Sequence, residues 1–353
     1  MKILPLFNVI FFFLPLGLMG KTHFDKKIER EFKITSEGKT SINNRYGKVD
    51  IKTWSEDKVK IKVTIQVEAS SMVEAEKTFD RFKIVFNNTS DHVSAITEIE
   101  SPSKTSWWLI TSSFKQNFSI NYEVFIPEKN SLSLVNKYGN IFVADLQGQS
   151  DIILAYGTGK IQSLKGMSHI DLSYGGLDIQ SFSKGEIVTK YSNISFQEIQ
   201  SLNLESKYSN INAEKVGRLV SISKYDNYKI QAAGTFKLNS QYTTIKIEEI
   251  SDDIQLDLKY GSVKMNLGND IQCVQINGSY ADFKIGILED SKFNLDVQSK
   301  YASVKYPSST NITSIIEKDH EKTIKGFWGS KNDVTTSIKI HLNYGGISIS
   351  EID

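Results

Sequence analysis

Residues 200–216 read QSLNLESKYSNINAEKV, and this unit of 17 residues decides the fold. Leu202 and Leu204 alternate with polar residues, a corner follows around Tyr208, and the alternation resumes at Ile211. Alternation with a period of two is typical of a strand with one buried face, and Gly or Asn beside the tyrosine suits a corner because both tolerate left-handed backbone angles. The unit therefore predicts two short strands joined by a bend.

The unit recurs along most of the chain, because a tyrosine returns every 17 or 18 residues just before a turn and a short apolar strand. The regular series consists of Tyr138, Tyr156, Tyr174, Tyr191, Tyr208, Tyr225, Tyr242 and Tyr260. Looser copies follow at Tyr280, Tyr301 and Tyr344, and one outlier, RYGKVDI around Tyr46, precedes the series. A fixed period of this size marks a repeat architecture.

A single unit cannot fold alone. Ordering its backbone costs roughly 1–2 kcal/mol per residue, whereas each of its four or five inward apolar side chains returns about 1.5–3 kcal/mol on burial. Stacked units share backbone hydrogen bonds and make the core continuous. The sequence therefore predicts an all-β fold, a parallel β-solenoid with rungs of 17–18 residues, which stack into a rod roughly 50 Å long.

Residues 21–130 predict an N-terminal β-rich capping region with one short helix. A capping box at Ser71 and Glu74, followed by apolar residues at helical spacing, predicts the helix at residues 71–82. The alternating stretches that predict strands are 29–35, 46–54, 58–68, 83–86, 92–100 and 118–126.

Residues 131–353 form the predicted β-solenoid repeat domain, with one interruption. Residues 307–340 break the rhythm with a charged stretch punctuated by glycine, which we interpret as a looped-out rung or a cap. Residues 335–352, TTSIKIHLNYGGISISEI, are expected to complete the last rung and to cover the end of the core.

Residues 1–20 predict a secretory signal peptide. Lys2 gives a positive start, residues 3–19 are almost wholly apolar, and Gly20 is a small residue at the expected cleavage site. The alternative is an uncleaved membrane anchor, because about 17 apolar residues approach the length needed to span a bilayer. With the signal removed, we expect a mature chain that does not span a membrane, located in the periplasm or at the cell surface.

The composition argues against several kinds of site. The 42 basic and 41 acidic residues leave a charge of +1, which argues against a nucleic-acid partner. Cys273 is the one cysteine, so no internal disulfide framework exists, and its place in an alternating strand predicts a buried side chain. The five histidines show no metal-ligand spacing, and we predict neither a metal nor a cofactor.

The tyrosines are interpreted as a structural ladder in which like rings stack from rung to rung. Tyr208 shares parity with Leu202 and Leu204, which predicts that the rings point inward or lie against the core. The alternative is a row of rings that binds glycan by stacking. The lysine before the tyrosine in six rungs is expected to face outward, which leaves open a stripe for an acidic polymer; the six are Lys137, Lys190, Lys207, Lys224, Lys259 and Lys300.

Two other features could contact a ligand. Trp107 and Trp108 are adjacent in a Ser/Thr-rich stretch, where they could touch a glycan or instead cover a sheet edge. Carboxylates such as Asp171 and Asp178 raise the possibility of a glycan-active enzyme, which would need two acids about 5–9.5 Å apart. No cluster of acids recurs at one rung position beside Arg or His, so we predict no catalytic residues.

Residues 118–148, FSINYEVFIPEKNSLSLVNKYGNIFVADLQG, resemble a segment of the bacterial "putative adhesin" β-solenoid family, which is related to head-GIN auto-transporter-adhesin-like domains. The matching positions are Tyr122, Val124 and Pro127, followed by the start of the rungs at 136–141. NYGGISIS at 343–350 resembles the family's terminal rung. The resemblance implies a Gram-negative envelope setting and brings no catalytic residues.

Together these observations predict an exported, non-enzymatic, adhesin-like β-solenoid that acts as a binding or scaffold protein of the cell envelope. Its expected partner is an envelope protein or a glycan. Two alternatives remain: a glycan-active enzyme on a β-helix scaffold, and a structural or regulatory periplasmic protein.

Overall fold

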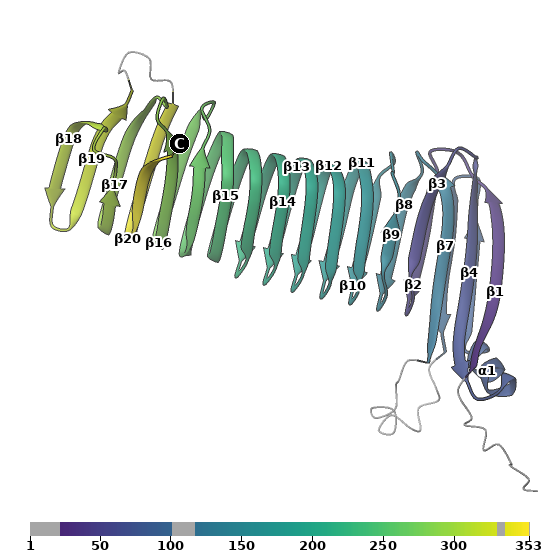
Figure 1. The fold of residues 1–353 in the computed structure, drawn as a ribbon. Helices are drawn as coiled ribbons and strands as arrows, with labels where there is room; N and C mark the ends of the chain where they lie inside the picture. The colour runs from purple at the N-terminus through teal and green to yellow at the C-terminus, as the bar shows by residue number, and fades with distance from the viewer. Residues whose placement is uncertain (1–21, 101–116, 330–335, 353) are drawn as a thin grey trace, which may run out of the picture.

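The protein is an elongated rod made almost entirely of β-strands (Figure 1). The computed structural model describes residues 22–100, 117–329 and 336–352. The strands are β1 (Thr22–Lys33), β2 (Lys39–Arg45), β3 (Val49–Trp54), β4 (Lys58–Ala69), β5 (Phe82–Asn88), β6 (His92–Ile99), β7 (Phe118–Pro127), β8 (Ser131–Lys137), β9 (Ile141–Val143), β10 (Ser150–Ala155), β11 (Thr158–Ser173), β12 (Gly176–Lys190), β13 (Asn193–Lys207), β14 (Asn210–Lys224), β15 (Asn227–Leu267), β16 (Cys273–Leu288), β17 (Phe293–Lys305), β18 (Asn311–Lys318), β19 (Glu321–Trp328) and β20 (Thr336–Ile352).

The middle of the rod is a regular solenoid, and the predicted fold class is confirmed. Strands β11 to β16 follow one another in sequence and in space, and the ladders between successive strands are parallel. The register places like residues over like residues, as where Ile211 of β14 lies between Ile194 of β13 and Tyr228 of β15. The inward side chains of all these rungs form one continuous apolar core.

The solenoid starts earlier in the sequence than the regular tyrosine series. Strand β2 pairs in parallel with β8, and β3 pairs in parallel with β9, so residues 39–54 form a rung that stacks on residues 131–143. Tyr46 is therefore a regular member of the series rather than an outlier. This rung lies on the N-terminal side of the boundary predicted at residue 131. The long excursion through β4 to β7 hides the repeat in the sequence.

Antiparallel strands cover the N-terminal end of the rod. Strand β7 pairs in parallel with β3, β4 pairs antiparallel with β7, and β1 pairs antiparallel with β4. Strand β6 pairs in parallel with β2, and β5 pairs antiparallel with β6. Helix α1 (Met72–Phe79) packs against β4 and β1. Its N-cap Ser71 accepts a hydrogen bond from the Glu74 backbone nitrogen at 3.3 Å, as the capping box predicted. The helix ends before Phe82, which begins β5.

The other end of the rod contradicts the expectation for residues 335–352. Strand β20 does not cover the end; it lies between β16 and β17 and pairs in parallel with both (Figure 1). The cover comes from residues 311–328, where β18 and β19 form an antiparallel hairpin that pairs with β17. In the regular rungs, strands stack in the order of the sequence. At this end the β18–β19 hairpin takes the outer position, and β20 lies between β16 and β17.

The prediction of a buried Cys273 is wrong, because the thiol is exposed. Val274 and Ile276 supply the inward face of β16, so the same alternation directs Cys273 outward. Strand β16 alternates as predicted, with the opposite phase at Cys273.

Candidate ligand-binding face

Each rung bends at its tyrosine, and the tyrosine itself takes the unusual backbone conformation. All twelve corner tyrosines, from Tyr46 to Tyr344, have a positive φ between 50° and 65°. This left-handed conformation costs an L-residue roughly 1–2 kcal/mol. The expectation that Gly or Asn beside the tyrosine supplies the left-handed angle is therefore wrong.

The glycine after the tyrosine is required for a different reason. A Cβ on Gly157 would lie 2.0 Å from the carbonyl oxygen of Gly139 in the rung before, and a Cβ on Gly175 would lie 2.0 Å from the carbonyl oxygen of Gly157. Successive corners approach so closely at these rungs that only glycine fits. Close packing between corners, rather than backbone freedom, selects the residue.

The tyrosine rings stack along the whole rod. Neighbouring ring centroids are 4.7 to 5.2 Å apart and the ring planes are 1° to 14° from parallel. In spatial order the stack runs Tyr46, Tyr138, Tyr156, Tyr174, Tyr191, Tyr208, Tyr225, Tyr242, Tyr260, Tyr280, Tyr344, Tyr301. Each stacked pair contributes about 0.5–1.5 kcal/mol, which offsets much of the backbone cost.

The rings face outward, contrary to the expectation that they point at the core. Every ring except that of Tyr46 is 38 to 50% exposed. The left-handed residue shifts the phase of the alternation by one, so Ser206 and Ser209 are both buried while Lys207 and Tyr208 between them are turned outward. Parity cannot be counted across such a corner.

The stack leaves no broad ring face for a ligand within the described residues. Every internal ring is covered on both faces by its neighbours. At one end the stack meets Phe118 edge-on, 5.6 Å from Tyr46, and at the other His320 stacks on Tyr301 at 4.9 Å. Only ring edges and hydroxyl groups reach solvent. Glycan stacking on these tyrosines is therefore sterically disfavoured.

Buried polar groups support the corner from below. Asp226 is 1% exposed and accepts hydrogen bonds from the Ser206 and Ser223 hydroxyls at 2.7 and 2.6 Å, and from the Ser209 and Lys224 backbone nitrogens at 2.7 and 3.0 Å. Beside it, burial raises the pKa of the Tyr228 hydroxyl to about 12. The carboxylate joins two neighbouring rungs into one network.

The six lysines before the corner share one register position but do not form a continuous stripe. Lys190, Lys207 and Lys224 are adjacent, whereas Ala155, Ser173, Gln241, Ser279 and Asn343 hold the same position in other rungs. Lys207 is paired with Glu205 at 3.0 Å and Lys300 with Glu321 at 2.8 Å. A binding stripe for an acidic polymer would be interrupted and partly neutralised.

The strands that follow the tyrosines carry a hollow on the described part of the rod. It is a groove of about 660 Å³ that crosses the rungs of β3, β9, β11, β12 and β13 and reaches β14. A second hollow of about 450 Å³ shares Ser195, Phe196 and Glu214 with it and extends to β15. The two form one groove along the rod, hereafter the post-tyrosine groove.

Amide side chains, charged side chains and one exposed aromatic ring line this groove. Gln162, Gln180 and Gln197 line it at the same position of three successive rungs, as their neighbours Ile161, Ile179 and Phe196 show. Each amide offers both donors and acceptors. Phe142 lines the same groove and is 39% exposed. A row of amides beside an open ring suits an elongated ligand that has both hydroxyl groups and apolar faces.

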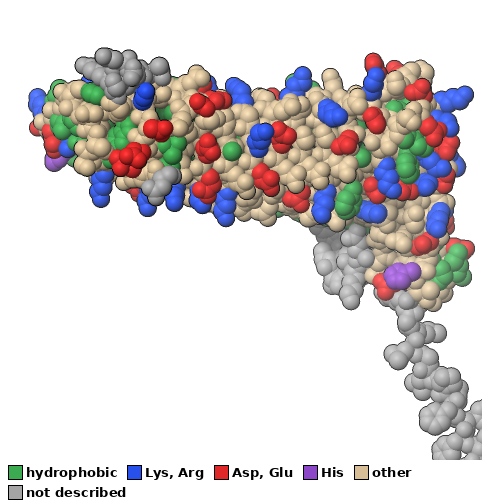
Figure 2. All heavy atoms as spheres, turned by 45° about the horizontal axis from the view of Figure 1, so that its top comes forward, with side chains coloured by type: hydrophobic (Ala, Val, Ile, Leu, Met, Phe, Trp, Pro, Cys, Tyr) green, Lys and Arg blue, Asp and Glu red, His purple; other side chains and the backbone are tan. Residues whose placement is uncertain are grey.

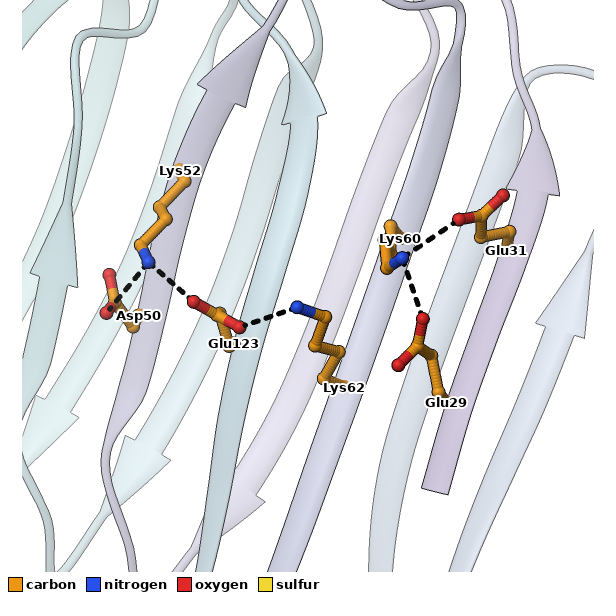
Figure 3. A network of polar contacts seen from close by, with 7 residues as sticks. All are labelled: Glu29, Glu31, Asp50, Lys52, Lys60, Lys62 and Glu123. Atoms are coloured by element: carbon orange, nitrogen blue, oxygen red, sulfur yellow. Dashed lines mark hydrogen bonds and ion pairs between the residues drawn. The ribbon is translucent and has the colours of Figure 1, made fainter. Parts of the chain in front are cut away.

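An ion-pair network borders the groove at the N-terminal end of the rod (Figure 3). Glu123 of β7 lies between Lys52, which hydrogen-bonds it, and Lys62 at 3.2 Å, and Lys60 bridges Glu29 and Glu31 on β1. The Lys52 hydrogen bond lowers the pKa of Glu123, and the Lys60 hydrogen bond lowers that of Glu29. These charges satisfy one another, and Lys52 among them lines the groove.

The remaining predicted contacts are distributed differently. Asp178 lines the post-tyrosine groove, whereas Asp171 lies on the strand before a corner and does not line it. Trp107 and Trp108 lie outside the described residues. Figure 2 shows acidic and basic side chains interspersed along the visible side of the rod. The sequence analysis did not predict the groove, because its lining residues become neighbours only when the rungs stack. They can be found in the sequence at positions four and six after each tyrosine.

In the described part of the chain, no helix is long and apolar enough to cross a membrane. The same residues contain no group of three or more His, Cys, Asp or Glu side chains placed to hold a metal ion.

No family model and no curated protein matches the chain. It is similar to solved structures described as a putative cell adhesion protein from Clostridium sporogenes (12% identity, 93% of this chain and 100% of that one, TM-score 0.19), a putative adhesin from Bacteroides fragilis (12%, 92% and 97%, TM-score 0.29) and a putative adhesin from Parabacteroides distasonis (9%, 92% and 97%, TM-score 0.26). These names agree with the adhesin family that the sequence resembles, and similarity at this level carries no argument about a site.

Proposed function

We propose that the chain is an exported, non-enzymatic binding protein of the bacterial cell envelope that holds an extended glycan in the post-tyrosine groove. The observation that supports this most strongly is the continuity of the groove across successive rungs, with an amide at one position in three of them. A linear polymer lying along the rod would meet an amide side chain at each of these three rungs.

The mechanism is polyvalent contact. Each rung offers one or two hydrogen bonds, which are weak separately, and a chain molecule that engages several rungs gains affinity because later contacts form at high effective concentration. Phe142 would cover an apolar face of one sugar ring in the groove. No turnover is required of these residues.

A glycan array with the folded protein, followed by titration of the best ligand, tests the proposal. The variant Gln162→Ala/Gln180→Ala/Gln197→Ala should weaken binding at least about tenfold, since a lost hydrogen bond contributes about 0.5–1.5 kcal/mol. The matched control is Gln255→Ala/Gln275→Ala, two exposed glutamines on strands before a corner, which should bind as the native protein does.

Loss of binding in the control to the same extent, or no binding by the folded native protein to glycans or envelope extracts, would contradict the proposal. Release of new reducing ends from a polysaccharide panel would instead support the glycan-active alternative.

Export is a separate part of the proposal and rests on the predicted signal peptide at residues 1–20, which lie outside the described residues. Cell fractionation combined with protease treatment of intact cells distinguishes a periplasmic from a surface location. Recovery of the full-length, unprocessed chain in the cytoplasm would contradict export.

A further inference from the structure

Strand β20 fills a slot inside the sheet rather than extending its end. It pairs with β16 along Cys273–Leu288 and with β17 along Phe293–Lys305, and its Tyr344 ring lies between Tyr280 and Tyr301 in the stack, 4.7 and 5.1 Å from them. Along β11 to β16, strands adjacent in space are also consecutive in sequence. The β16–β20–β17 order breaks this rule.

The two walls of the slot are matched to each other as well as to β20. Cys273 and Asn294 both pair with Ser337, so β16 and β17 could pair directly in the same register if β20 were absent. The spacing from Tyr280 to Tyr301 is 21 residues, close to one rung of the regular series. The chain therefore has two compatible arrangements: β17 directly on β16, or β17 separated from β16 by β20.

The inserted arrangement is the more stable one, because β20 forms two ladders where direct pairing forms one. The backbone hydrogen bonds of the additional ladder contribute about 0.5–1.5 kcal/mol each. Leaving the slot does not expose two unpaired edges, because the walls can close on each other. A strand held in this way can exchange without unfolding the rod.

The slot is selective for the sequence of β20. At the corner, Gly345 has a φ of 103°, and a Cβ there would lie 2.2 Å from the carbonyl oxygen of Ala281. A Cβ on Gly346 would lie 2.5 Å from the Ser303 hydroxyl oxygen. The backbone contact at Gly345 requires glycine directly after the corner tyrosine, whereas the Ser303 hydroxyl can rotate away from a Cβ at position 346. Residues 336–352 meet this requirement and have alternating apolar residues on both sides.

We propose that the slot between β16 and β17 is a strand-binding site that accepts β20 from a second copy of this chain as well as from its own. The contacts in the exchanged pair are the same as those within one chain. The balance between the two forms depends on protein concentration, as in domain swapping. Exchange would join two rods side by side near one end and double the number of grooves available to a polymer.

The single native thiol reports on the occupant of the slot. Cys273 is exposed and pairs with Ser337 of β20, and parallel neighbours about 4.8 Å apart satisfy the Cα separation of a disulfide. The full chain with Ser337→Cys should form an internal disulfide on mild oxidation. Failure to form it would contradict the register on which the proposal rests.

The decisive experiment mixes two forms of the full chain, refolds them together at high concentration and oxidises them. The slot donor is the native chain, with Cys273. The strand donor is a size-tagged Cys273→Ser/Ser337→Cys chain. The control strand donor is Cys273→Ser/Lys339→Cys, whose thiol would face Gln275, about 8 Å from Cys273 and beyond disulfide reach.

We expect a mixed disulfide between the two chains at a yield at least about tenfold higher for the Ser337→Cys donor than for the Lys339→Cys donor. Equal yields would mean random collision of exposed thiols and would overturn the proposal. The absence of any mixed disulfide after joint refolding would overturn it as well, because the strand would then enter only its own slot.

Discussion

The corners of the rungs and the strands that follow them belong to the same repeat, yet they differ in every property that matters for binding. At the corner the residue is constant, the rings cover one another, and buried partners such as Asp226 hold neighbouring rungs together. On the post-tyrosine groove the outward residues vary, and the surface is open. The constant corner, whose rings cover one another, is the structural frame, and the site is to be sought on the open groove, where an amide recurs in three rungs.

The largest expected effect of breaking the frame is at Asp226. Replacing it with alanine leaves two buried hydroxyls and two backbone nitrogens without their acceptor, and we expect a loss of about 3 kcal/mol or more in the free energy of unfolding. Denaturant titration measures it. Asp178→Ala, the same substitution in the groove, should change the free energy of unfolding by no more than about 0.5 kcal/mol. Equal losses in the two variants would contradict the division between a structural corner and a binding groove.

A second effect concerns the tyrosine. Tyr208→Ala keeps the left-handed corner and removes two ring contacts, so we expect a loss of about 2 kcal/mol. Tyr208→Gly should be less destabilising than Tyr208→Ala, the reverse of the order in an ordinary strand, because glycine avoids the left-handed cost of about 1–2 kcal/mol. Tyr208→Phe should be nearly neutral. Alanine proving better than glycine would contradict the corner geometry.

A smaller effect concerns pH at the border of the groove. Lys52 and Lys62 lower the pKa of Glu123 below its ordinary value of 4.5. Their ion pairs with Glu123 therefore stabilise the fold fully at pH values above 4.5, and this contribution disappears as the pH falls through the lowered pKa. Exposed pairs contribute about 0.2–1 kcal/mol, and we expect the lower end.

Thermal unfolding of native protein and Glu123→Gln measures this effect. The variant should be the less stable above pH 4.5, and the difference should shrink under acid conditions. A difference that grows as the pH falls would show that the sign is wrong.

Local pattern was sufficient to predict the all-β class, the rungs and the helix start at Ser71, because each depends on residues close in sequence. The direction of the tyrosine rings could not be predicted, since one left-handed residue shifts the parity of all that follow. The place of β20 could not be predicted either, because its alternation resembles that of the other rungs and sequence order favoured the outer position. The groove was accessible in principle, since Gln162, Gln180 and Gln197 hold equivalent positions, but its depth depends on how the strands stack.

The most direct test of the division between the structural corner and the binding groove uses two variants of one rung, Tyr191→Ala at the corner and Gln197→Ala in the groove. Stability and capture of the best array glycan are measured in parallel, below the unfolding transition of both. We expect Tyr191→Ala to lower the unfolding midpoint and keep the affinity, and Gln197→Ala to keep the midpoint and weaken the affinity about two- to tenfold. A folded Tyr191→Ala protein with weakened affinity, beside a Gln197→Ala protein with native affinity, would contradict this division.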